Sequence, residues 1–184
     1  MRIRHLRLGA ALSAALVILG CGTSSTSSDP ALGGGPKEVT EAFLEAVRVG
    51  DDKKAETLLT PITRQKMAEH ETAVAPPGSE TAKYAVRDVM MVDGGAHVAT
   101  DWTDVDADGQ MHTDRIVWIL RQEPEGWRIA GMATKVFDDR PPVVLNFEDP
   151  AEMMRQQKWV GEEMARREGS QTPSASAAPE KKMR

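Results

Sequence analysis

Residues 83–137, KYAVRDVMMVDGGAHVATDWTDVDADGQMHTDRIVWILRQEPEGWRIAGMATKVF, decide the fold of this chain. Apolar and polar residues alternate along most of this stretch, and a period of two predicts half-buried β-strands. Three short segments rich in Gly, Asp, Glu and Pro divide it, and Asp-Gly steps between apolar runs are typical of hairpin turns. We therefore expect an antiparallel meander of four strands, at about 83–92, 95–104, 111–121 and 127–137.

One run within this stretch, Ile116-Val117-Trp118-Ile119-Leu120, is apolar at every position. A strand that is apolar on both faces is expected to be buried among its neighbours. The third strand should therefore be central in the sheet.

The residues before the sheet show a helical period. Glu38–Val49 places apolar residues on one face and charged residues on the other. Asp51 or Asp52 can cap a second helix, which ends before Pro61 because proline disfavours helix in the residue that precedes it. A third helix is expected at about Pro61–Glu71. The residues expected to face the sheet are Val39, Ala42, Phe43, Ala46, Val47, Ala55, Leu58, Leu59, Ile62 and Met67.

After the meander, the prolines of residues 140–142 are expected to end the sheet, and residues 143–147 to form a short extended segment. Asp149 then caps a helix that begins at Pro150 and reaches about Arg167. The least polar face of this helix is rich in methionine, a side chain that adapts to irregular surfaces. This face either packs on its own sheet or contacts a partner protein or a second copy, as in a homodimer. It consists of Met153, Met154, Gln157, Val160, Gly161 and Met164, with Trp159 nearby.

Helices followed by a run of strands indicate an α+β domain, with the helices on one face of the sheet. Residues 39–51 (VTEAFLEAVRVGD), 55–61 (AETLLTP) and 126–131 (GWRIAG) resemble the opening helices and final strand of the NTF2-like (cystatin-like) superfamily. The resemblance covers about residues 36–137. It implies N-terminal helices packed on a curved antiparallel sheet of about four strands, a cone with an inner pocket. The superfamily includes enzymes, pocket binders and protein-interaction modules, so the fold does not choose the function.

The first 21 residues, MRIRHLRLGAALSAALVILGC, carry three arginines before a short apolar run. That run, about 12 residues, suits a signal peptide and is too short to span a bilayer. Residues 18–21 (ILGC) resemble the lipobox of bacterial lipoproteins. The resemblance implies cleavage of a signal peptide, residues 1–20, and acylation of Cys21, which would anchor the protein in a membrane. The alternative is an ordinary secretory signal with a chance cysteine.

Low-complexity segments flank the expected domain. Residues 21–35 are mostly Gly, Ser and Thr, as expected for a flexible tether from a membrane anchor. Residues 169–184 have the composition of a disordered tail, whereas 138–168 extend beyond the NTF2-like resemblance. The expected location is the bacterial cell envelope. Gly22 after the cysteine favours the periplasmic face of the outer membrane if the source is Gram-negative.

The composition limits the possible partners. The formal net charge is −5, and removal of residues 1–20 would bring it near −8. That sign opposes binding to nucleic acid or to an anionic lipid surface. The single cysteine is the expected lipid site, so no disulfide can form and the domain must rely on its apolar core. No phosphate loop, nucleophile elbow or zinc motif occurs, and we expect no cofactor.

Residues 104–109 (DVDADG) have the composition of a calcium-binding loop. An EF-hand loop of about twelve residues ends in a bidentate Glu, and this chain has Arg115 at that position. The flanking residues also predict strands. We expect a hairpin turn there and no metal site.

Seven polar or aromatic residues are candidates for a pocket, although no motif marks any of them as catalytic. His97 and Asp101 share one face of a strand but lie about 13 Å apart along it, so they cannot touch. The alternate face carries Val98, Thr100 and Trp102 and should be the packed one. The simpler interpretation is an outward polar sheet face, and the sharper one is an acid–base group inside a cone. The candidates are Tyr84, Asp88, His97, Asp101, Trp102, His112 and Trp118.

Three functional hypotheses follow. The first is a membrane-anchored lipoprotein with a non-enzymatic binding or assembly role. The second is a small isomerase- or dehydratase-type enzyme, which requires an open pocket with titratable groups of strongly shifted pKa. The third is a calcium-responsive domain. An interior filled by side chains would favour the first hypothesis over the second.

Overall fold

The computed structural model describes residues 33–70, 78–106 and 108–171. The expected signal peptide, the lipid site Cys21, most of the tether and most of the tail lie outside these residues.

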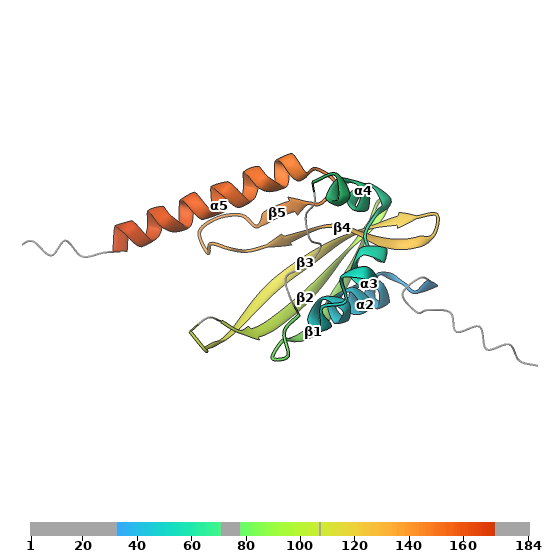
Figure 1. The fold of residues 1–184 in the computed structure, drawn as a ribbon, viewed down its shortest axis with the longest axis horizontal. Coiled ribbons are helices and arrows are strands. Elements are labelled where there is room, and N and C mark those ends of the chain that lie inside the picture. Colours follow the sequence, from blue (N-terminus) through green and yellow to red (C-terminus); the bar gives the residue numbers. More distant parts are fainter. Residues whose placement is uncertain (1–32, 71–77, 107, 172–184) are drawn as a thin grey trace, which may run out of the picture.

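The described residues form an α+β fold around one antiparallel sheet of five strands (Figure 1). Each strand pairs with the next one in the chain, so the spatial order is β1-β2-β3-β4-β5 and β3 is central, as the sequence predicts. The strands are β1 (Lys83–Val92), β2 (Gly95–Val105), β3 (Met111–Glu123), β4 (Gly126–Thr134) and β5 (Val143–Asn146).

The fifth strand corrects the expectation of about four. Residues 140–142 do not end the sheet, because the chain turns back there and β5 pairs with β4, with Val143 opposite Thr134. Four residues are too few to show a period in the sequence. Pairing with the free edge of β4 nevertheless gives their backbone N–H and C=O groups hydrogen-bond partners.

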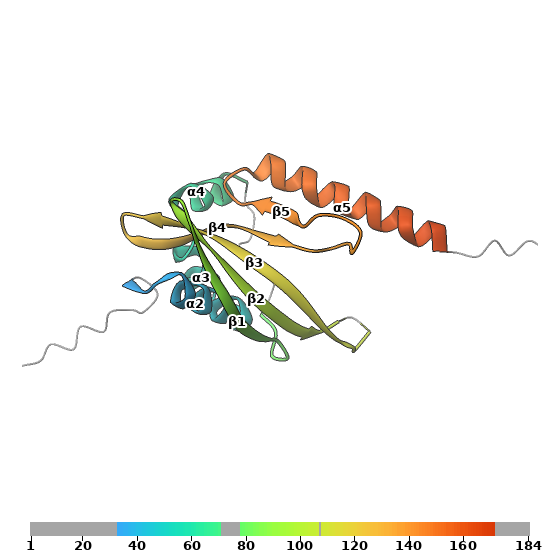
Figure 2. The same cartoon turned by 180° about the vertical axis from the view of Figure 1, so that it is seen from behind.

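The helices are gathered in two places. Figures 1 and 2 show α2, α3 and α4 grouped at one end of the sheet, while α5 lies along β5 and extends toward the other end. The last helix continues past Arg167, its expected end, to Gln171. The helices are α2 (Pro36–Val49), α3 (Asp52–Thr57), α4 (Pro61–His70) and α5 (Pro150–Gln171).

Local signals place the helix ends where the sequence predicts them. Gly50 ends α2 with a left-handed φ of 72°, which costs glycine little. The Asp51 side chain accepts a hydrogen bond from the Lys54 N–H and so caps α3. Asp149 caps α5 in the same way, by accepting from the Glu152 N–H at 3.0 Å.

The core lies between the helices and one face of the sheet, which we call the inner face. Phe43 of α2 meets Trp118 of β3 edge to face, with ring centroids 5.1 Å apart. Leu58 and Leu59 are fully buried, and backbone hydrogen bonds tie this segment to Ile129 of β4. One expectation is wrong in α4. There Ile62 is exposed, and Thr63 is buried with Met67.

The methionine-rich face of α5 packs on the domain only in part. Met153 packs against the core, but Met154 and Met164 are 53% and 46% exposed. The side of α5 that faces the domain instead includes Glu163, which is buried and whose carboxylate accepts hydrogen bonds from Arg166 and Arg167. The side of α5 that contacts the domain is therefore rotated relative to its least polar face, and it includes an ion-paired glutamate that the hydrophobic pattern does not indicate.

Candidate functional site

The face of the sheet opposite α2, which we call the outer face, carries the side chains that alternate with the core residues. In the register of β2 and β3, His97 lies opposite Ile119 and Asp101 lies opposite Arg115. Directly opposed residues in antiparallel strands point to the same face. These four side chains therefore share the outer face, while Trp118 points to the inner one.

A hollow of about 710 Å³ opens on this face, and we call it the outer groove. Its floor is apolar and crosses β3, β4 and β5, with Val117, Ile119, Ala133 and Val144. The volume lies in the range of small-molecule sites, which are mostly apolar with a few polar groups. The remaining lining residues are His97, Asp101, Thr113, Arg115, Thr134, Lys135 and Pro142.

The rim of the outer groove carries more positive than negative charge. Arg87 approaches one oxygen of Asp101 at 2.8 Å, and Arg115 approaches the other at 3.4 Å. The hydrogen bond from Arg87, with help from Arg115, lowers the pKa of Asp101, so this carboxylate is ionised at neutral pH. Two guanidinium groups thus share one carboxylate. Lys135 is exposed and has no ion-pair partner in the part of the chain that the structure describes.

The inner face of the sheet is packed around Trp118. Trp118 is buried against Phe43, and its indole N–H donates to Thr100 Oγ1 at 3.0 Å. Thr100 in turn donates to the Ile116 carbonyl. Among the described residues, no buried side-chain nitrogen or oxygen lacks a hydrogen-bond partner. This region is occupied by satisfied side chains.

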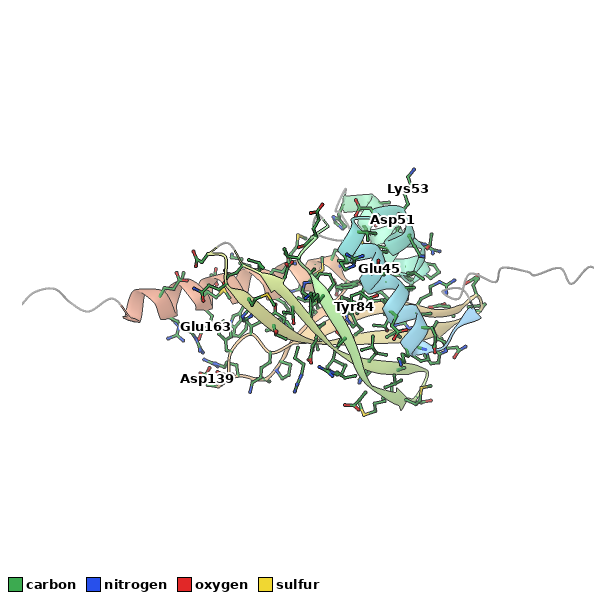
Figure 3. The ribbon with its side chains drawn as sticks, turned by 90° about the horizontal axis from the view of Figure 1, so that it is seen from below. Glu45, Asp51, Lys53, Tyr84, Asp139 and Glu163 are labelled. Carbon is green, nitrogen blue, oxygen red and sulfur yellow. The ribbon has the colours of Figure 1, made fainter. Side chains whose placement is uncertain are left out.

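Tyr84 lies where α2 crosses the sheet, next to Glu45 (Figure 3). Its hydroxyl donates to Glu45 at 3.4 Å, and its ring stacks on Trp102. Burial, and then the nearby Glu45 carboxylate, raise the pKa of Tyr84. The hydrogen bonds from Arg48 lower the pKa of Glu45. Both shifts move these groups away from neutral pH, which is unfavourable for proton transfer at that pH.

The seven predicted candidates do not meet in one pocket. His97 and Asp101 line the outer groove, whereas Tyr84, Trp102 and Trp118 lie on the inner face. His112 contacts Asp114 at 3.0 Å and lines a second hollow of about 730 Å³, which lies on the inner face beyond Trp118 and which Met164 also borders. Asp88 is exposed beside an irregularity in β1, between Val86 and Val89.

The acidic loop after β2 is a hairpin turn. Asp106 Oδ1 accepts hydrogen bonds from the N–H groups of Asp108 and Gln110, and Asp104 Oδ1 accepts from the Ser79 hydroxyl. These carboxylate oxygens are therefore engaged in hydrogen bonds within the chain. Across residues 33–70, 78–106 and 108–171, no group of three His, Cys, Asp or Glu side chains is placed to hold a metal ion.

Sequence reasoning did not single out the cations and the apolar floor of the outer groove. The alternation of side chains along β3 places Val117 and Ile119 on the face opposite to that of Trp118, and this was the sequence signal for the groove floor. Arg115 and Lys135 carried no motif, because their role depends on the register with β2 and on the turn between β4 and β5.

Two comparisons complete the description of the site. No model of a known protein family matches this chain, and no curated protein matches it. The helices within the described residues include none that is long and apolar enough to cross a membrane.

Proposed function

We propose that this chain is a non-enzymatic binding module at the bacterial cell envelope and that it binds its ligand in the outer groove. One observation carries the proposal. Around Trp118 the inner face of the sheet is filled by packed side chains, whereas the outer face keeps an apolar groove uncovered. Folding tends to bury apolar surface, so a patch left open is a frequent mark of a binding site.

Anchoring through Cys21 is the second part of the proposal, and it rests on the lipobox resemblance. The experiment is metabolic labelling with a palmitate analogue, followed by membrane fractionation. We expect label and protein in the membrane fraction, at the outer membrane in a Gram-negative host. The Cys21→Ser variant should lose the label. Equal labelling of both chains would contradict the anchor.

We also propose an NTF2-like relationship for residues 36–137. The support is the position of α2 against an antiparallel sheet, with Phe43 packed on the central strand. The proposal does not require an open cone, because the binding site that we infer lies on the other side of the sheet.

Three groups with shifted pKa values give no support to the enzymatic alternative. An isomerase or dehydratase needs a group that exchanges a proton near its working pH. In the outer groove Asp101 is held ionised by Arg87 and Arg115, and on the inner face the pKa values of Tyr84 and Glu45 move away from neutrality.

The groove can be tested with a neutral alkyl photoprobe that carries a diazirine, added to membranes that contain the full chain. We expect crosslinks in the tryptic peptide 116–121, which contains Val117 and Ile119. Val144→Glu should reduce these crosslinks, whereas Met154→Glu, an exposed change on α5, should not. Uniform labelling of the surface in all three chains would contradict the proposed site.

A further inference from the structure

We infer that the outer groove takes a single acyl chain that ends in an anionic headgroup, a carboxylate or a phosphate. The inference rests on the proposed function, because it assumes that the outer groove is the binding site.

The shape of the floor favours a chain. Val117 of β3, Ala133 of β4 and Val144 of β5 lie side by side in the sheet register. Neighbouring strands are about 4.8 Å apart, so these three residues make an apolar track about 10 Å long across the strands. Ile119 widens the track along β3. A flexible methylene chain can follow such a track without leaving polar groups unpaired on it.

The charge at one rim favours an anionic end. The Arg115 side chain is 79% exposed, and its one hydrogen bond within the described residues runs from Nε to Asp101. Lys135 lies on the same rim without an ion-pair partner in these residues. Asp101 is already shared with Arg87, so it does not cancel both. A carboxylate or phosphate placed there would complete the ion pairs.

The overall charge of the protein separates this ligand from a membrane surface. The chain as a whole is acidic, with a net charge of −5, so an anionic bilayer would repel most of it. A single amphiphile meets only the local excess of positive charge at Arg115 and Lys135. The rim therefore favours a single amphiphile with one anionic end over the surface of an anionic bilayer.

The experiment uses the full chain in membranes, with a diazirine fatty acid as the photoprobe and unlabelled competitors. Dodecanoate and dodecyl phosphate should prevent labelling of peptide 116–121 at lower concentrations than dodecanol or dodecyltrimethylammonium. Burial of each added methylene is worth about 0.8 kcal/mol, so potency should rise about fourfold per carbon until the groove is full.

Variants separate the chain from the headgroup. Lys135→Gln should weaken competition by the anionic compounds about two- to fivefold, the range of an exposed ion pair, and leave dodecanol unchanged. Lys158→Gln removes an exposed cation of α5 and should change nothing. Ile119→Glu and, on an edge strand, Val144→Glu should both reduce labelling of peptide 116–121, with circular dichroism to check that each chain is folded.

The outcomes distinguish the two proposals. If dodecanol competes as well as dodecanoate and Lys135→Gln has no effect, the headgroup inference is wrong and the groove remains a binding site. If labelling requires anionic vesicles, the surface docks on a bilayer and the inference is also overturned. If no alkyl probe labels the groove, both proposals fail.

Discussion

The inner and outer faces of this sheet are built from the same strands but are covered differently. Trp118 and Ile119 are neighbours in the sequence, yet Trp118 is 7% exposed beneath Phe43 and Ile119 is part of an open groove. Side chains alternate along a strand, so one apolar run can supply a core and a binding surface together. The continuous apolar run of β3 therefore supplies both a packed core face and the apolar floor of the outer groove.

The largest expected effect comes from truncating the two neighbours separately. Trp118→Ala should lower the free energy of unfolding by about 3–5 kcal/mol, because it leaves a cavity against Phe43. Ile119→Ala should cost about 1 kcal/mol, because its side chain is only half-buried and lines the outer groove. Urea unfolding measures both. Equal losses of unfolding free energy in the two variants would show that Ile119 is as well packed as Trp118, so the two faces would not differ.

The next effect concerns β5, which forms part of the groove floor. A Cβ on Gly131 would lie 2.6 Å from the Leu145 carbonyl oxygen, so Gly131→Ala must push the two strands apart. We expect a loss of about 1–3 kcal/mol, faster amide exchange in residues 143–146 and weaker labelling of the outer groove.

A glycine in open space provides the control for that change. Nothing lies within 4 Å of a Cβ built on Gly161 of α5. Gly161→Ala should therefore stabilise the protein by up to about 1 kcal/mol, through helix propensity. Destabilisation by both changes to a similar degree would mean that strand contact at Gly131 is not the cause.

A smaller effect is expected where α5 meets the segment after β4. Figure 3 shows Asp139 and Glu163 close together, and Arg167 bonds both. Hydrogen bonds from Arg166 and Arg167 lower the pKa of Glu163 from 4.5 to about 2. A lowered pKa stabilises the fold fully above pH 4.5, and this contribution disappears as the pH falls toward 2.

Thermal unfolding between pH 2 and 6 tests this contact. Glu163→Gln should lower the midpoint at pH 6 and flatten its decline below pH 4.5. Glu162→Gln changes an exposed neighbour and should keep the wild-type profile. A wild-type decline in Glu163→Gln would place the acid-sensitive group elsewhere.

The smallest effect concerns Tyr84, the only tyrosine of the chain, whose ionisation is therefore visible without interference from another tyrosine. Glu45→Gln removes the carboxylate that helps to raise the pKa of Tyr84. Ultraviolet titration should show that pKa moving down, with stability changed by less than about 1 kcal/mol. Glu38→Gln, on the same helix, should leave it unchanged. An unmoved pKa in Glu45→Gln would mean that the Glu45 carboxylate does not contribute to the raised pKa of Tyr84.

Much of the architecture was predictable because it depends on short-range signals. The alternation in β1 to β4, the turn at Gly94 and the caps at Asp51 and Asp149 all act over a few residues. The site was only partly predictable. His97 and Asp101 were candidates, but the partners of Asp101, Arg87 and Arg115, are 14 residues away in either direction, and nothing local indicates them.

The sequence by itself determined the strands, the helices and the face of β2 that packs, because hydrophobic periodicity and backbone geometry are local properties. Only the tertiary structure decided that residues 143–146 join the sheet, that α5 turns Glu163 inward and that the outer face stays open. These features depend on which distant segments reach one another. The free energy of that packing is a property of the assembled fold and is absent from any single segment.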